Sequence, residues 1–242
     1  MKNLSLVWVA LAILVSSCNQ VKEAPKVKAV MSAENQKNMS PDAALKDLME
    51  GNERYVSGNM INRDLNEQIK ATTNGQYPKA VVLACIDSRV PVEYIFDQGV
   101  GDIFVARVAG NIEDVDLLGS MEYGVGVAGS KIILVMGHEN CGAVKSAIKK
   151  VDVGSENVTA LLNEIEPAIL EVEGERDDKN KDYFDCVVKN NVLQTIEDIR
   201  KRSKIIRDLE AKGQIKVVGA YYSLKDGKVS LLEDERKCCD HS

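Results

Sequence analysis

Four short apolar runs alternate with longer segments of helical pattern, and this alternation constrains the fold more than any other feature of the sequence. The runs are residues 79–85, 102–107, 131–136 and 215–222. Each is largely continuous rather than alternating, which is typical of a strand buried on both faces of a parallel sheet. Strands that alternate with helices predict an α/β fold in which helices flank a mostly parallel central sheet.

The segments around these runs predict the helices. Ser40, Pro41 and Asp42 form a helix start, with a capping serine, a proline in the first helical position and an acid in the first turn. Apolar residues then recur on roughly one face up to Val56. Further helices are expected at 117–127, 141–149, 158–172 and 185–211, and a last strand at 229–232.

Residues 1–17 are predicted to be a targeting signal rather than part of the fold. Lys2 precedes an apolar run at 4–15, which has the length of a signal-peptide core and is short for a membrane-spanning helix. Two serines precede Cys18, and this pattern resembles the bacterial lipobox, whose cysteine is lipidated. We therefore expect an exported, membrane-anchored lipoprotein that faces the periplasm or the cell exterior. A plain secretory signal or an N-terminal anchor is the alternative.

Composition divides the rest of the 242-residue chain and excludes some functions. Residues 18–39 are polar and rich in Lys and Glu, which predicts a flexible tether before a domain at 40–233 and a tail at 234–242. The formal net charge of −6 leaves no basic stripe for nucleic acid, so we expect no nucleic-acid partner. Six cysteines are too few for the disulfide scaffold of a small secreted domain.

Reactive side chains lie at the ends of two predicted strands. Cys85 ends the first strand, and His138 and Cys141 follow the third. Ligand sites of open parallel sheets lie at the carboxyl ends of the strands, so these side chains converge if the two strands are neighbours. Two thiolates and an imidazole suit zinc, and three protein ligands leave the fourth position open, as in catalytic zinc sites. Each residue alone is more typical of a core; the combination favours a metal centre.

Asp87 and Arg89 lie two and four residues beyond Cys85. An aspartate held by an arginine can accept a hydrogen bond from a metal-bound hydroxide, or bind the metal itself. The competing interpretation is a thiol enzyme with Cys85 as nucleophile and Arg89 as anion clamp. Cys-dependent phosphatases place that arginine further along, across a glycine-rich loop, and the charge of Asp87 would repel a phosphate. We therefore prefer the metal site.

These residues resemble those of the β-class carbonic anhydrases. The two zinc motifs of that family are matched, in order, by Cys85-x-Asp87-x-Arg89 and His138-x-x-Cys141-Gly142. The similarity continues through GDIFV at 101–105, RVAGN at 107–111 and GAYY at 219–222. It covers the whole predicted domain, and the two motifs together are highly specific.

The resemblance implies a lyase that reversibly hydrates carbon dioxide to bicarbonate and a proton by attack of zinc-bound hydroxide. It implies one Zn²⁺ per chain on Cys85, His138 and Cys141, with Asp87 and Arg89 orienting the hydroxide. It also places four residues in the substrate pocket: Gln76, Phe104, Tyr123 and Gly142. These residues suit the plant-like, open-site subtype; in the other subtype Asp87 binds the metal in a closed state.

The resemblance further implies a homodimer or higher homo-oligomer, with pocket residues shared across the interface. The helix that begins after Ser40 matches the N-terminal arm of the family, which packs on the partner subunit; a helix that covers its own domain is the alternative. Two other functions stay open. One is a CS2 or COS hydrolase with the same zinc ligands, and the other is a non-catalytic zinc- or bicarbonate-binding lipoprotein, against which the Asp87–Arg89 pair weighs.

Overall fold

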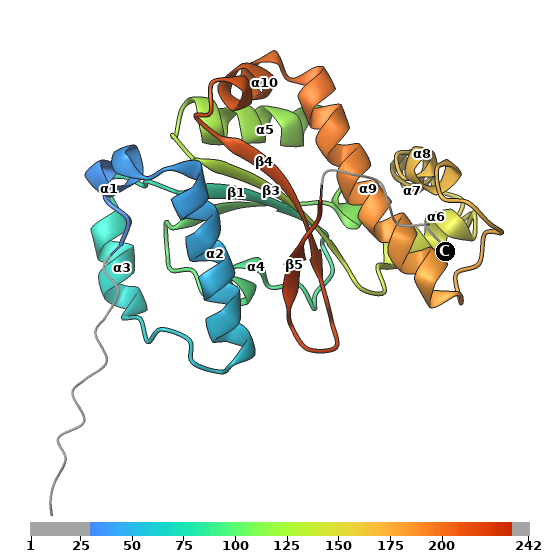
Figure 1. Cartoon of the computed structure of the whole chain (residues 1–242), viewed down its shortest axis with the longest axis horizontal. Helices are drawn as coiled ribbons and strands as arrows, with labels where there is room; N and C mark the ends of the chain where they lie inside the picture. The colour runs from blue at the N-terminus through green and yellow to red at the C-terminus, as the bar shows by residue number, and fades with distance from the viewer. Residues whose placement is uncertain (1–29, 234–242) are drawn as a thin grey trace, which may run out of the picture.

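A sheet of five strands forms the centre of the computed structural model, which describes residues 30–233 (Figure 1). The strands are β1 (Ala80–Ala84), β2 (Ile103–Arg107), β3 (Ile132–His138), β4 (Lys216–Tyr222) and β5 (Val229–Leu231). Their order is β2-β1-β3-β4-β5, and β5 alone runs antiparallel to its neighbour. Every residue of β1 and β3 is buried, which explains their continuously apolar sequences. The predicted α/β fold with a mostly parallel sheet is confirmed.

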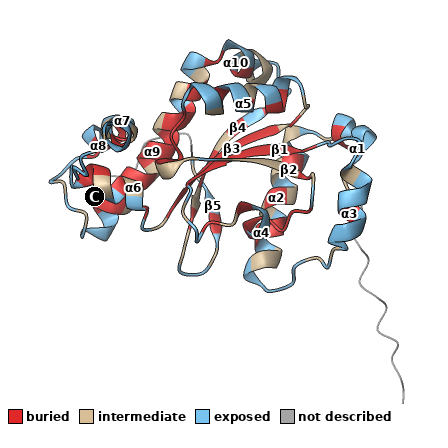
Figure 2. Cartoon of the chain, turned by 180° about the vertical axis from the view of Figure 1, so that it is seen from behind, coloured by how far each residue is buried: buried red, intermediate tan, exposed pale blue. Residues whose placement is uncertain are grey.

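Helices cover both faces of this sheet. On one face lie α2 (Pro41–Val56) and the short α4 (Val92–Ile95), and on the other lie α5 (Val115–Gly126), the second half of α9 (Lys181–Arg202) and α10 (Lys204–Ala211). Buried residues concentrate on the strands and on the inner sides of these helices (Figure 2). The sheet therefore has an apolar core on each side.

A separate group of helices packs beside the carboxyl end of the sheet. It consists of α6 (Gly142–Ile148), α7 (Glu156–Asn163), α8 (Glu166–Leu170) and the first half of α9. Their buried apolar side chains form one cluster that also contains Cys85 and Cys141. This cluster places the two cysteines between the strand ends and a helical layer, away from bulk water.

Several helix boundaries follow from local capping. Ser40 accepts a hydrogen bond from the Ala43 N–H at 3.1 Å, and α2 starts at Pro41 as predicted. The segments predicted as single helices at 158–172 and 185–211 are each divided in two. Ser203 ends α9 and caps α10 by accepting from the Ile206 N–H, and Pro167 lies in the first turn of α8. A proline fits there because the first turn needs no intrahelical N–H bond.

The predicted flexible tether is too long at its C-terminal end, because Ala33–Asn38 form helix α1. Ser32 caps this helix, and the buried Gln36 donates from Nε2 to the carbonyl oxygens of Pro78 and Ala128 at 2.7 and 2.8 Å. Sequence pattern alone gave no sign of these contacts, which join α1 to the loops before β1 and β3. Three further short elements were not predicted: α3 (Leu65–Thr72), α4 and the 3₁₀ turn η1 (Ala109–Asn111).

Helix α2 packs against the sheet of its own chain. Ala44 and Leu48 are fully buried in the core beneath it, and Asn52 donates to the carbonyl oxygen of Ile95 at 3.1 Å. Within one chain, α2 therefore behaves as a helix of its own domain. The predicted signal at 1–17, Cys18 and the tail at 234–242 lie outside the described residues. Among residues 30–233, no helix combines the length and apolar character needed to cross a bilayer.

Candidate metal centre

Cys85, His138 and Cys141 converge at the carboxyl end of the sheet. Cys85 directly follows β1, His138 is the last residue of β3, and Cys141 is the N-cap of α6. Because β1 and β3 are parallel neighbours, their ends meet at one edge. One potential ligand atom from each residue lies within 4.8 Å of the other two, and all three residues are buried. The expected convergence is present.

The imidazole of His138 is oriented for metal binding. Its Nδ1 lies 2.9 Å from the carbonyl oxygen of Glu139, and since a carbonyl can only accept, Nδ1 carries the proton. Nε2 is buried and makes no hydrogen bond within the described part of the chain. The peptide of Glu139 is itself fixed, because its N–H donates to the Tyr222 carbonyl at 2.9 Å. Nε2 therefore presents a lone pair that metal binding would satisfy.

The pKa values of the Cys85 and Cys141 thiols are shifted in opposite directions. A hydrogen bond from Cys141 is the main reason that the pKa of Cys85 is lowered, and the Gly110 N–H, 3.4 Å from the sulfur, lowers it further. The same hydrogen bond, together with burial, raises the pKa of Cys141. Cys85 is thus already disposed to be a thiolate. Two sulfur ligands and an imidazole with an unpaired buried nitrogen fit a zinc ion.

Asp87 and Arg89 form a two-pronged ion pair beside this cluster. Arg89 donates from Nε to Oδ1 at 2.9 Å and from Nη2 to Oδ2 at 2.7 Å, and its backbone N–H also donates to Oδ1. These hydrogen bonds hold the pKa of Asp87 well below its usual range, so the carboxylate stays charged through neutral pH. Asp87 Oδ2 lies 3.9 Å from His138 Nε2. A negatively charged acceptor therefore faces the position between the ligands.

Two residues, one at the end of β2 and one just beyond it, also hold the site, and neither role was predicted from the sequence. Arg107 donates to the carbonyl oxygens of Cys85 and Asp87, and Gly110 donates its N–H to the Cys85 sulfur. Gly110 has φ of +76°, and a Cβ there would come within 2.8 Å of Ile165 Cδ1. Both residues belong to the RVAGN segment at 107–111. The signal in the sequence that could have indicated a role for Arg107 is its position at the end of a predicted strand, next to the strand that leads to Cys85.

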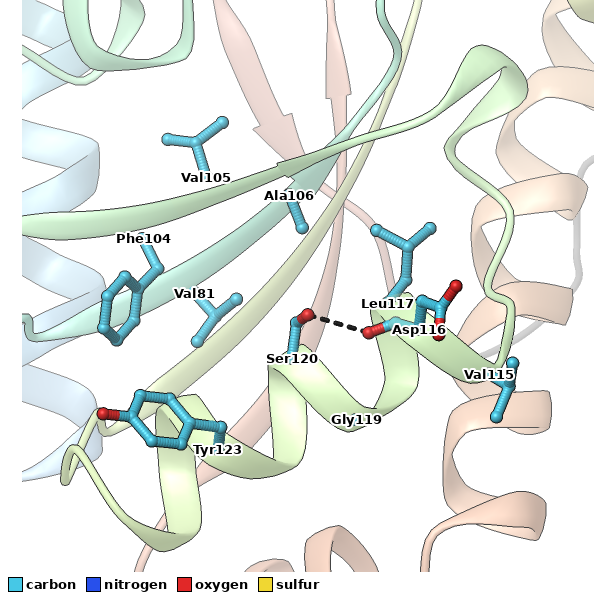
Figure 3. Close-up of a pocket in the computed structure, with 10 residues that line it drawn as sticks. All are labelled: Val81, Phe104, Val105, Ala106, Val115, Asp116, Leu117, Gly119, Ser120 and Tyr123. Carbon is cyan, nitrogen blue, oxygen red and sulfur yellow. Dashed lines mark hydrogen bonds between the residues drawn. The ribbon is translucent and has the colours of Figure 1, made fainter.

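Phe104 and Tyr123 line a different cavity of about 550 Å³ between β2 and α5 (Figure 3). Their ring centroids are 6.4 Å apart. Phe104 is paired with Val81, whereas Cys85 lies beyond the Ala84–Arg107 pair at the end of the strands. At about 3.3 Å per residue along a strand, Phe104 lies roughly 10 Å back from that end.

The four predicted substrate-pocket residues are therefore not all in one place. Gly142 directly follows the ligand Cys141 and begins α6. Gln76 is exposed in the loop before β1, and Phe104 and Tyr123 line the cavity beside β2. In the part of the chain that the structure describes, none of the three potential metal ligands lines that cavity. The structure brings Gly142 to the metal centre but not the other three.

Comparisons with known proteins agree with this architecture. The family model described as carbonic anhydrase matches residues 80–229. Carbonic anhydrase 2 of Mycobacterium tuberculosis is 39% identical over 201 residues, which cover 81% of this chain and 95% of that protein. The carbonic anhydrase of Mycolicibacterium smegmatis is 39% identical over 199 residues, covering 80% and 94%.

The fold of this chain is also similar to that of solved structures. A solved structure of a Coccomyxa β-carbonic anhydrase in complex with acetazolamide matches with a TM-score of 0.61 at 26% identity, covering 78% of this chain and 86% of that one. The motifs, the convergent strand ends and these similarities point to one assignment: the chain belongs to the carbonic anhydrase family of enzymes and has the β-class fold.

Proposed function

We propose that the chain catalyses the zinc-dependent, reversible hydration of carbon dioxide to bicarbonate and a proton. The observation that carries this proposal is the buried Cys85–His138–Cys141 cluster, with its ligand atoms within 4.8 Å, faced by a charged carboxylate. When bound there, zinc supplies a Lewis acid that makes a water molecule a sufficient nucleophile at neutral pH.

In this proposal Asp87 accepts a hydrogen bond from the attacking group and so aims its lone pair at carbon dioxide. Arg89 keeps the carboxylate charged and fixes the direction of both oxygens. Because both oxygens are bound to Arg89, the arrangement favours the open, plant-like state, in which Asp87 stays off the metal. Gly142 borders the same position from the start of α6.

Hydrolysis of COS or CS2 would use the same ligands, and non-catalytic binding of zinc or bicarbonate would need only some of them. The named relatives favour carbon dioxide, and the oriented Asp87–Arg89 pair favours catalysis over binding. Comparing kcat/KM for CO2, COS and CS2 at equal zinc content tests the choice. We expect CO2 to react fastest; hydrolysis of COS or CS2 without CO2 hydration would overturn the assignment.

We further propose that two copies of the chain associate along β2, so that Gln76, Phe104 and Tyr123 of one chain complete the substrate pocket of the other. Strand β2 is one of the two edge strands of the sheet among residues 30–233. Exposed apolar side chains lie beside it on α5, with Val115 71% and Tyr123 54% exposed. An unpaired edge strand with exposed apolar neighbours favours association.

Mixing two defective variants tests this shared site. Cys141→Ser lacks a metal ligand but keeps the pocket wall, whereas Phe104→Ala with Tyr123→Ala keeps the ligands but lacks the wall. In random symmetric dimers, half of the molecules pair the two variants and each restores one site, so we expect about a quarter of the wild-type rate. If each chain built its own complete pocket, dissociating and re-associating the mixture would give only the average of the two variants.

The N-terminal pattern supports the proposal that Cys18 is lipidated and holds the enzyme on a membrane, facing the periplasm or the cell exterior. Gln36 joins α1 to the loops before β1 and β3, so the described chain enters the domain at the edge opposite the metal centre. Labelled palmitate should enter the wild-type chain and not a Cys18→Ala variant. Equal labelling of both, or of neither, would contradict lipidation at Cys18.

A further inference from the structure

The side chain of Arg107 continues the link between β2 and β1 at the point where the backbone ladder ends. Arg107 is the last residue of β2 and is paired with Ala84, the last residue of β1. The Val108 N–H donates to the Ala84 carbonyl at 3.1 Å. Beyond this bond, Arg107 Nε donates to the carbonyl oxygen of Cys85 at 2.9 Å and Nη2 donates to that of Asp87 at 2.6 Å.

These two hydrogen bonds hold a segment that has left the sheet. Ile86, between the two bound carbonyls, is 60% exposed, so little side-chain packing fixes the backbone there. Hydrogen bonds from a charged guanidinium are stronger than neutral ones, and its fork fixes the direction of both partners. Because the carbonyls belong to Cys85 and Asp87, one side chain sets the relative orientation of a metal ligand and of the carboxylate that faces the metal position.

The same segment contacts Cys85 from a second side. The Gly110 N–H donates to the Cys85 sulfur at 3.4 Å, and Asn191 of α9 donates from Nδ2 to the Gly110 carbonyl at 2.7 Å. The segment from Arg107 to Gly110 therefore contacts both the backbone and the sulfur of Cys85, and α9 holds its far end. Replacing a group that orients a metal ligand in this way commonly lowers metal affinity or activity by about 10–100-fold.

We propose that Arg107 is a positioning residue of the metal centre: by binding the carbonyl oxygens of Cys85 and Asp87, it holds the segment 85–87 in the conformation that binds metal. This inference rests on the proposed zinc function, although its test measures metal binding rather than turnover. Arg107 contacts neither metal nor substrate in this scheme.

The test compares Arg107→Met and Arg107→Lys with wild type and with Arg207→Met. Arg207 is a matched control, since it also donates to two backbone carbonyls, those of Arg200 and Lys201, at the end of α9. Zinc affinity is measured on the full chain in mild detergent by competition with a chelator. The visible spectrum of the cobalt-substituted protein reports the geometry of the sulfur ligands.

For Arg107→Met we expect zinc to bind about 10–100-fold more weakly and the cobalt–thiolate bands to change. Arg107→Lys should lie between this variant and wild type, because an ammonium lacks the fork that reaches both carbonyls. Arg207→Met should bind zinc normally. Unchanged affinity and spectrum in Arg107→Met, or equal weakening in Arg207→Met, would overturn the inference.

If Arg107→Met does not fold, Arg107→Lys decides the question by the same two readouts: wild-type affinity and spectrum contradict the inference, and weaker binding with altered bands supports it. The outcome is independent of the proposed reaction. A wild-type chain that binds zinc without hydrating CO2 would contradict the proposed function. The zinc affinities and cobalt spectra of the Arg107 variants would still decide whether Arg107 positions the metal centre.

Discussion

Replacing Cys141 with serine is expected to lower zinc affinity by more than about 100-fold. Losing a residue that only hydrogen-bonds to a metal ligand already lowers the affinity by about 10–100-fold, and Cys141 is itself a ligand in this proposal. Cys141 is fully buried, and its sulfur belongs to the group of ligand atoms within 4.8 Å. A serine hydroxyl stays protonated at neutral pH and is a poorer zinc ligand than a thiolate. Zinc analysis of the purified variant should show little bound metal, and CO2 hydration should fall to the buffer rate.

Cys186→Ser is the matched control for this variant. Cys186 lies in α9, is buried like Cys141, and is the one cysteine among residues 30–233 besides the proposed ligands Cys85 and Cys141. It does not belong to the group that could hold a metal. We expect this variant to keep its zinc and its activity, with a loss of stability of about 1–3 kcal/mol from the buried hydroxyl. A Cys141→Ser chain with full zinc and a wild-type rate would remove Cys141 from the metal centre.

Replacing Asp87 with asparagine is expected to lower kcat by about 10²–10⁴-fold while zinc content stays at the wild-type level. The substitution removes the charge that Arg89 binds and replaces one acceptor oxygen with a donor. Stopped-flow hydration and zinc analysis of the same preparation measure both effects.

The pH dependence of the wild-type enzyme follows from the same ion pair. Since the pKa of Asp87 is lowered in the folded chain, its carboxylate remains charged as pH falls through the ordinary carboxyl range near 4. The contribution of the Asp87–Arg89 pair to the stability of the folded chain is fully present above that range. It is lost only as pH falls below that range towards the lowered pKa of Asp87. We therefore expect no titration of Asp87 in a kcat profile between about pH 6 and 9.

Asp208→Asn controls for the loss of an ion-paired carboxylate, because Asp208 pairs with Lys204 on the solvent-exposed side of α10. It should leave kcat and zinc unchanged. An Asp87→Asn chain that loses zinc in parallel with activity would show Asp87 to be a ligand, which favours the closed subtype. Wild-type turnover in Asp87→Asn would remove Asp87 from the mechanism.

The strands could be predicted closely because burial on both faces leaves a continuous apolar run. The region predicted at 79–85 contains β1 at Ala80–Ala84, and that at 215–222 contains β4 at Lys216–Tyr222. Helix α1 could not be predicted, because the contacts of Gln36 join it to loops 42 and 92 residues away. The break at Ser203 was missed because a serine that caps the next helix resembles an ordinary serine inside one long helix.

The metal ligands were predictable because their chemistry is visible at two strand ends, and topology then requires the ends of parallel neighbours to meet. Arg107 was not, because its role depends on the register that pairs it with Ala84, and it acts on carbonyls 20 and 22 residues away. The same register places Phe104 beside Val81 rather than at the strand end. A motif identifies such a residue but does not say which site it serves.

The most direct test of the account is the rate of CO2 hydration as a function of zinc occupancy. Metal is removed with a chelator, zinc is added back in steps, and each sample is measured by stopped flow beside Cys141→Ser. We expect the rate to rise in proportion to bound zinc, to level off at about one zinc per chain, and to stay at the buffer rate in Cys141→Ser. A chain that binds one zinc and hydrates CO2 no faster than buffer would contradict the central claim.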